Sequence, residues 1–192
     1  SYYPIKSWGL LEDDNVGGTR HHVWARIDIP GPKDLWVISV HMSTQYTKRL
    51  KSMSDLLDDI ETLGIPASDF LAIGGDFNTK KFADTTLETL ASTGRIVLDT
   101  SEAEDYPIDQ SGNGATSSNR TKPLDGIYTS QNLKNLRTPV VIGKAKNLTL
   151  RGLVFDSREF KPLSEVSPIL ESDSAAKNMQ HMAVVKDYAI QR

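Results

Sequence analysis

Phe70-Leu71-Ala72-Ile73-Gly74-Gly75-Asp76-Phe77-Asn78-Thr79 is the segment with the clearest signal in this chain of 192 residues. Its first half has the apolar composition and the length of a buried strand, and the two glycines that follow allow a sharp turn and the close approach of a ligand. Asp76 can accept a proton or hold a hard cation, while Asn78 can donate to a phosphoryl oxygen or ligate through its carbonyl. Two interpretations follow: a phosphoester-cleaving site, or an ordinary polar turn after a buried strand.

The composition is that of an ordinary globular protein, 38% hydrophobic and 24% charged, and the length suits one domain. No stretch approaches the length of a membrane span. Because there is no cysteine, disulfides and thiolate chemistry are excluded. A net charge of −3 argues against a protein that depends on non-specific DNA affinity, so any contact with nucleic acid would need a local basic patch or a metal ion. The compartment stays open between a bacterial cytoplasmic and a secreted protein.

Hydrophobic periodicity predicts a chain dominated by strands, preceded by an irregular stretch over residues 1–20. The expected strands lie at residues 23–29, 35–41, 70–75, 96–99, 124–129, 140–150 and 182–190. The first two of these should form an antiparallel hairpin, because Pro and Gly fill the short link between them. Helices are expected at residues 48–63 and 85–92, with Gly64 ending the first, and long surface loops at residues 100–123 and 157–177. This pattern indicates an α/β or α+β protein built around a sheet sandwich.

Polar side chains occur at the ends of four expected strands. His41 ends the second strand, Asp76 and Asn78 follow the third, Asp125 begins a later strand, and His181 directly precedes the last one. A single histidine at a strand end is more often a satisfied surface residue than a catalyst. Several such residues together are more informative, since strand ends are rigid mounts from which side chains can converge.

The order of these motifs resembles that of the endonuclease/exonuclease/phosphatase superfamily, which includes deoxyribonuclease I, apurinic endonucleases, inositol polyphosphate phosphatases and bacterial sphingomyelinases. The resemblance rests on strand–His41, Gly75-Asp76-Phe77-Asn78, Leu124-Asp125-Gly126-Ile127-Tyr128 and His181 before a strand, and it spans residues 23–190. It implies an α/β fold, a four-layer α/β/β/α sandwich with two mostly antiparallel sheets. It also implies metal-dependent phosphoester hydrolysis, with Mg²⁺ or Mn²⁺ as the cofactor.

The resemblance also implies a role for each of the five residues. Asp76 would activate or orient the attacking water near the metal, and Asn78 would hold the phosphate. His181 would stabilise or protonate the phosphoryl group, with Asp125 as the carboxylate that fixes its tautomer. His41 would be a second active-site histidine that contacts the phosphate.

Two departures from the family pattern affect the expected metal site. The family begins with a strand that ends in Asn and a Gln-Glu segment that supplies the main metal ligand, and nothing before Val23 matches them. Glu12 has the wrong setting and is expected in a solvated acidic turn. Gln180 stands where the family has an aspartate, so the expected metal ligands are Asp76 and, weakly, Gln180. The chain, residues 1–192, is therefore expected to be the C-terminal two-thirds of a single domain, with an uncovered apolar surface that a second chain could complete.

Three functions remain open. The first is a metal-dependent phosphodiester hydrolase, above all a nuclease that acts on DNA. The second is a phosphatase or a sphingomyelinase-like phosphoesterase, and the third is a catalytically silent binding or scaffold module. The partner would be nucleic acid or another phosphodiester substrate. Basic residues at positions 48–51 and 80–81 could contact phosphates, but a solvated helix face and a soluble loop are the commoner origin of such clusters.

Overall fold

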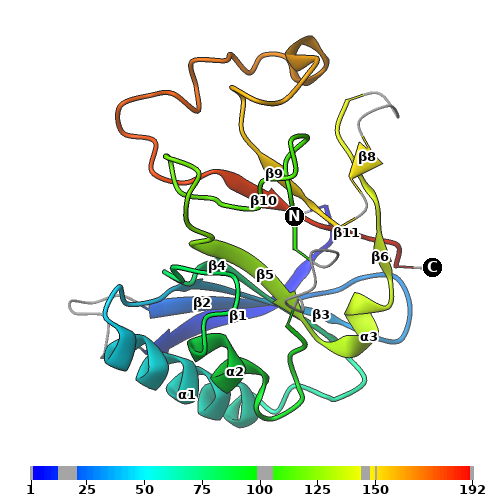
Figure 1. Cartoon of the computed structure of the whole chain (residues 1–192). Coiled ribbons are helices and arrows are strands. Elements are labelled where there is room, and N and C mark those ends of the chain that lie inside the picture. Colours follow the sequence, from blue (N-terminus) through cyan, green and yellow to red (C-terminus); the bar gives the residue numbers. More distant parts are fainter. Residues whose placement is uncertain (1, 13–20, 99–105, 144–147, 150, 191–192) are drawn as a thin grey trace.

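The computed structural model describes residues 2–12, 21–98, 106–143, 148–149 and 151–190, and five strands form its main sheet (Figure 1). In order across the sheet they are β1 (Ile5–Glu12), β2 (His21–Ile27), β3 (Leu35–His41), β4 (Phe70–Asp76) and β5 (Asp125–Thr129). Neighbouring strands are antiparallel except β3 and β4, which are parallel. The nearly continuous apolar sequences of β3 and β4 suit these inner positions, because an inner strand is covered on both faces.

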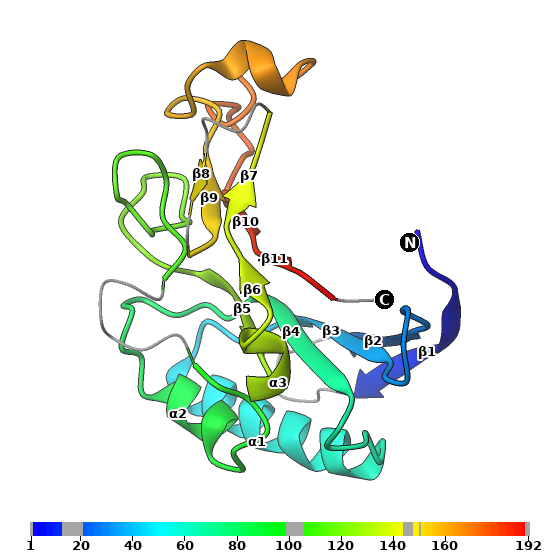
Figure 2. The same ribbon diagram turned by 90° about the vertical axis from the view of Figure 1, so that its right-hand side faces the viewer.

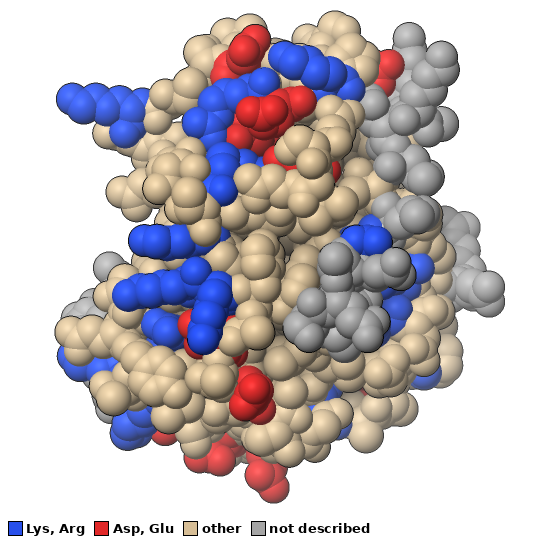
Figure 3. Space-filling view, viewed as in Figure 1, with Lys and Arg blue, Asp and Glu red and all other residues tan. Residues whose placement is uncertain are grey.

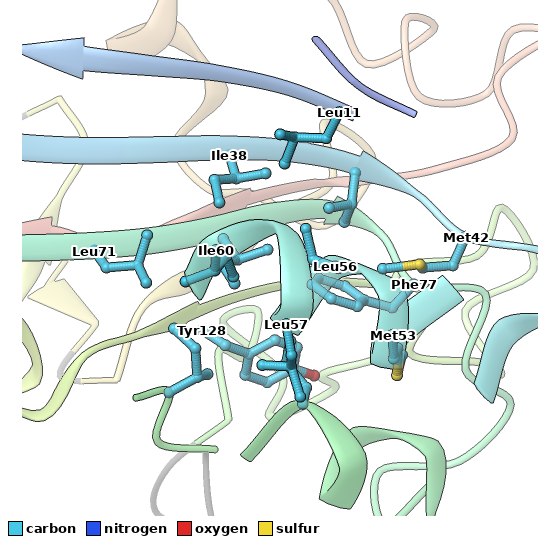
Figure 4. Close-up of a cluster of buried hydrophobic side chains, with 14 of the residues drawn as sticks. Leu11, Ile38, Met42, Met53, Leu56, Leu57, Ile60, Leu71, Phe77 and Tyr128 are labelled. Atoms are coloured by element: carbon cyan, nitrogen blue, oxygen red, sulfur yellow. The ribbon is translucent and has the colours of Figure 1, made fainter. Parts of the chain in front are cut away.

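Two helices cover one face of this sheet (Figure 2). Helix α1 (Tyr46–Thr62) connects β3 to β4, and α2 (Thr86–Ala91) packs beside α1. The apolar stripe of α1 meets the sheet in the largest hydrophobic core, which includes Met53, Leu56, Ile60, Ile38, Leu71, Phe77 and Tyr128 (Figure 4). Gly64 follows α1 with a φ of +62°, the left-handed conformation that commonly ends helices. Within the described ranges, no helix combines the length and the apolar character needed to cross a bilayer.

Short strands and loops lie on the opposite face of the main sheet (Figures 1 and 2). They form three antiparallel pairs, β9 with β10, β6 with β11 and β7 with β8. A small core of Val140, Leu153 and Phe160 holds this part together. The elements are α3 (Gln131–Lys134), β6 (Arg137–Thr138), β7 (Val140–Val141), β8 (Leu148–Thr149), β9 (Leu153–Phe155), the 3-10 helix η1 (Leu163–Val166), β10 (Ala183–Val185) and β11 (Asp187–Tyr188).

Most predicted elements of the main sheet are present. The hairpin of β2 and β3 is antiparallel, β3 has the predicted bounds, and α1, β4, α2 and β5 each lie within two residues of their predicted ends. Residues 106–123 form the predicted loop, while residues 100–105 lie outside the described residues. The mixed α/β class is therefore confirmed. In Figure 1 the helices α1 and α2, the main sheet and the small sheets form successive layers. On the far side of the small sheets, η1 is the only helix among the described residues.

Four predictions about strands differ from the structure. Residues 5–12 form strand β1 rather than an irregular stretch, because exposed Trp8 and Leu10 beside buried Leu11 hide the alternation of a half-buried strand. Within the range 140–150, β7 and β8 are separate strands that pair with each other, and Gly143, with a φ of +71°, follows β7. Residues 144–147 and 150 of this predicted strand lie outside the described residues. Residues 182–190 are divided between β10 and β11, which pair with different strands. At residues 96–98 only an isolated bridge from Val97 is present, and residue 99 lies outside the described residues.

The face of β1 and β2 that points away from the helices exposes apolar side chains. Trp8 is 69% exposed and Leu10 is 55% exposed, and Val23, directly opposite Leu10 on β2, is 44% exposed. The expected uncovered apolar surface is thus present. Exposure alone does not identify what covers such a surface, so the expected second chain gains no support from it.

Candidate active site

The strand register places three of the predicted residues side by side. His41 at the end of β3 is opposite Asp76 at the end of β4, and Asp76 is opposite Asp125 at the start of β5. Val40 and Ile73 point into the helix-covered core, so strand alternation directs these three side chains to the other face, toward the small sheets. One row across three strands therefore presents an imidazole and two carboxylates on a rigid support.

Gly75 lets β3 and β4 approach closely at this point. Its φ is +144°, and a Cβ at this position would lie 2.1 Å from the carbonyl oxygen of Val40. No side chain fits in that space, because real Cβ atoms do not approach oxygen so closely. The second glycine of the Gly-Gly pair is therefore required by the packing of β4 against β3, whereas the sequence predicted a sharp turn and the approach of a ligand at this point.

A tight turn holds Asp76 in a fixed orientation. The backbone N–H of Asn78 donates to Asp76 Oδ1 at 2.8 Å, and the Asn78 side-chain amide donates to Asp76 Oδ2 at 3.0 Å. The same amide also donates to the carbonyl oxygen of Met42 at 2.8 Å, which links the loops after β3 and β4. Asn78 adopts a φ of +52°, a conformation that asparagine tolerates better than most residues. In this arrangement Asn78 orients Asp76, and its contact with phosphate stays a prediction.

His181 reaches this row from the loop that precedes β10. Its Nδ1 lies 2.8 Å from Asp125 Oδ2, which is a hydrogen bond, and its Nε2 lies 3.9 Å from Asp76 Oδ2. On the other side, His41 Nε2 lies 3.5 Å from the same Asp76 oxygen. Asp76 is thus flanked by two imidazoles, and the side chains of His41 and His181 remain 54% and 31% exposed. Of the five side chains predicted to converge, His41, Asp125 and His181 lie around Asp76, and Asn78 is hydrogen-bonded to the same carboxylate.

The surroundings of Asp76 shift the pKa of its carboxyl. Burial raises the pKa of this carboxyl above its ordinary value, and the nearby charge of Asp125 raises it further. The hydrogen bond from the Asn78 N–H and the two histidines act in the opposite direction without cancelling the rise. A carboxyl with a raised pKa is a better proton acceptor than a solvated one, and a nearby cation would oppose the shift.

Three of these side chains could share a metal ion. One ligand atom from each of Asp76, Asp125 and His181 can be chosen so that all three lie within 4.8 Å of one another. Two carboxylates and an imidazole fit a divalent cation such as Mg²⁺ or Mn²⁺. Gln180 is exposed, and its backbone carbonyl accepts a hydrogen bond from Ser118, so a metal contact of its side chain stays a prediction. Glu12 is exposed at the end of β1 instead of in a turn, and two strands separate β1 from β4.

Sequence reasoning missed a buried arginine beside the site. Arg49 was assigned to a solvated helix face, but it is 2% exposed and donates to the carbonyl oxygens of Ser43 and Thr44, just after His41. It also pairs with Asp84 at 3.3 Å. The spacing of Arg49 from Met53 places both on the buried stripe of α1, and this was the signal that could have identified it.

Further supporting residues come from the loop over residues 106–123. Thr116 is 1% exposed, and its Oγ1 accepts a hydrogen bond from the backbone N–H of Asp125 at 3.0 Å. A cluster of Asp109, Arg120, Asp156 and Arg158 forms ion pairs beneath this loop. No periodic pattern in the sequence predicts these contacts, because they join loops that are distant along the chain.

Comparisons with known proteins were made by sequence and by structure. No family model and no curated protein matches the chain. Among solved structures, a mannosyl-6-phosphatase from Bacteroides thetaiotaomicron is 17% identical with a TM-score of 0.53, over 72% of this chain and 60% of that one. A beta toxin variant from Staphylococcus aureus with bound magnesium ions is 19% identical with a TM-score of 0.50, over 69% and 51%. An endonuclease/exonuclease/phosphatase family protein from Bacteroides thetaiotaomicron is 17% identical with a TM-score of 0.51, over 67% and 51%.

These matches concern the fold, since the identities are below 20%. The chain spans between 51% and 60% of the length of these three solved structures. They agree with the layered sheet and helices described above and with the family resemblance inferred from the motifs. The chain therefore has the deoxyribonuclease I-like fold of the endonuclease/exonuclease/phosphatase superfamily.

Proposed function

We propose that this protein is a metal-dependent phosphoester hydrolase whose reaction takes place at Asp76, Asp125, His181 and His41. The observation that carries the proposal is the convergence of the Asp76, Asp125 and His181 ligand atoms within 4.8 Å of one another. Phosphoester hydrolysis needs a positioned water, a cation and groups that neutralise charge on the phosphoryl oxygens. All of the residue types that this chemistry requires are present at one end of three adjacent strands.

Each side chain has a defined part in this proposal. Asp125 accepts a hydrogen bond from His181 Nδ1–H, and the other ring nitrogen, Nε2, faces Asp76. When the imidazole is protonated, Nε2–H can donate to a phosphoryl oxygen or to a leaving group. Asp76, with its raised pKa, accepts a proton from the attacking water or holds that water in place. His41, on the open side of Asp76, contacts the phosphate. The carboxylates of Asp76 and Asp125 would hold the metal, which supplies charge stabilisation when bound, so that Nε2 of His181 keeps its role toward the phosphate.

The substrate class we favour is nucleic acid, as expected from the sequence. Although the net charge is −3, Figure 3 shows several Lys and Arg side chains at the left of the view, where the small sheets meet the helix-covered part, with some Asp and Glu side chains beside them. Such a local patch would attract a phosphate backbone. The match to a mannosyl-6-phosphatase favours a second candidate, a phosphatase that acts on a small phosphoester. A catalytically silent module is the alternative if no phosphoester is cleaved.

The test compares hydrolysis of plasmid DNA, bis(p-nitrophenyl) phosphate and p-nitrophenyl phosphate with Mg²⁺, with Mn²⁺ and with a chelator. We expect turnover that requires the metal, and a fall of about 10²–10³-fold for Asp76→Asn, the loss typical of removing one charge-stabilising group. Asp58→Asn is the matched control, since it makes the same change on the exposed face of α1. Circular dichroism checks that both variants fold. No turnover with any metal on any substrate, or equal rates for both variants, would contradict the proposal.

A further inference from the structure

One residue of the 106–123 loop, Thr116, bonds both to Asp125 and to Met182, the residue that follows His181. The hydroxyl oxygen of Thr116 accepts the backbone N–H of Asp125 at 3.0 Å, at the start of β5. The carbonyl oxygen of Thr116 accepts the backbone N–H of Met182 at 2.7 Å, directly after His181. Thr116 is 1% exposed, so neither contact is weakened by competition with water.

The residues after Thr116 hold the other side of His181. Ser117 forms an isolated antiparallel bridge with His181, and the backbone N–H of Ser118 donates to the carbonyl oxygen of Gln180 at 2.8 Å. His181 is therefore paired on both sides with Thr116–Ser118 through the backbone. At His181 this loop takes the place of a neighbouring strand. It thereby holds the imidazole at its distance from Asp125.

Buried ion pairs fix the loop from below. Arg120 pairs with Asp109 and donates to the carbonyl oxygen of Ala115, and its Nε lies 3.3 Å from Asp156. Arg158 pairs with Asp156 at 2.7 Å and donates to the carbonyl oxygen of Ser118 at 3.0 Å. Two arginines and two aspartates thus anchor both ends of the Thr116–Ser118 segment, and their charges balance.

We propose that Thr116 is a positioning residue that aligns the Asp125 carboxylate with His181 Nδ1. This inference rests on the proposed function for its effect on rate, but its structural part is independent of it. The hydroxyl fixes Asp125 through its backbone, and the carbonyl fixes His181 through Met182, so one residue sets the spacing of the pair. Replacing Thr116 with valine removes the first link and keeps the second, because only the side chain changes.

The experiment compares Thr116→Val with Thr116→Ser, which keeps the hydroxyl, and with Thr129→Val. Thr129 is 3% exposed and lies at the far end of β5, so it controls for the loss of a buried hydroxyl on the same strand. The first readout is the tautomer of the His181 imidazole, measured from its ¹⁵N chemical shifts. The second is the separation of kcat from KM on the substrate that gives turnover.

In the parent protein and in the Ser and Thr129 variants, we expect the Nδ1–H tautomer that the Asp125 contact selects. Thr116→Val should shift the imidazole toward the Nε2–H tautomer and lower kcat about 10- to 100-fold with little change in KM, as for other residues that orient a catalytic group. An unchanged tautomer together with an unchanged kcat would overturn the inference. A shifted tautomer in a protein that cleaves no phosphoester would support the positioning role and overturn the proposed function instead.

Discussion

The two sides of the candidate site are built in different ways. On one side, the main sheet and its two helices form a continuous apolar core that supports the ends of β3, β4 and β5. On the other side, the small sheets share a smaller apolar core in which Val140, Leu153 and Phe160 are buried, and ion pairs with a buried Asp156 hold their loops. The first side supplies His41, Asp76, Asn78 and Asp125, whereas the second supplies His181.

This difference separates two ways of fixing a catalytic group. Backbone register fixes His41, Asp76 and Asp125, so these residues move only if the strands move, and Asn78 is hydrogen-bonded to Asp76 in the turn after β4. His181 depends on hydrogen bonds and charges in loops, where few apolar contacts oppose local opening. We therefore expect the sheet side to lose stability when a substitution disturbs its backbone packing. The loop side should lose stability when a substitution removes a single polar group.

The largest loss of stability is expected for Gly75→Ala. The new Cβ would meet the Val40 carbonyl oxygen at 2.1 Å, and a φ of +144° is unfavourable for alanine, so β3 and β4 would have to separate. We expect a loss of at least about 3 kcal/mol in the free energy of unfolding. Gly74→Ala is the matched control, because its nearest neighbour, a side-chain atom of Ile127, is 3.4 Å away. Urea unfolding measures both variants, and similar losses would contradict a steric requirement at Gly75.

An intermediate loss of stability is expected for Asp156→Asn. The Asp156 side chain has no exposed surface and pairs with Arg120 and Arg158, so the change leaves two guanidinium groups with a weaker partner. The expected loss is about 2 kcal/mol, the scale of one hydrogen bond to a charged group. Hydrogen exchange should accelerate at the Ser118 and Met182 amides and stay unchanged in β3 and β4.

The control for this change is Asp187→Asn, which lies on the same side of the molecule but is exposed. It should leave both stability and exchange within error of the parent protein. Equal acceleration of exchange in the loops and in β4 would show that the two sides of the site unfold together. It would contradict the expectation that the loop side opens separately.

The sequence predicted the sheet side well because periodic patterns encode it. A nearly continuous apolar run gave β3 with its bounds, the apolar stripe gave α1, and polar residues at strand ends gave the row of His41, Asp76 and Asp125. The loop side was predicted poorly, since Thr116 bonds to Met182, 66 positions away, through polar atoms that follow no period. Arg49 was missed for another reason, because a charged residue on an apolar stripe is usually solvated, and its partner Asp84 lies in a different segment.

The smallest expected effect is the pH dependence of the stability that Asp156 contributes. Burial alone would raise the pKa of Asp156, but hydrogen bonds from Arg158 and the charge of Arg120 hold it below its ordinary value of 3.8. Stability from these contacts is therefore fully present above pH 3.8 and is lost as the pH falls through the lower folded-state pKa. The difference in unfolding free energy between the parent protein and Asp156→Asn should shrink as the pH is lowered from 7 to 3, because the parent loses the ionised carboxylate that the variant already lacks. Asp187→Asn should follow the parent protein over the whole range. A difference that stays constant down to pH 3 would mean that Asp156 acts through packing and neutral hydrogen bonds, and that charge is not what holds the loop beneath His181.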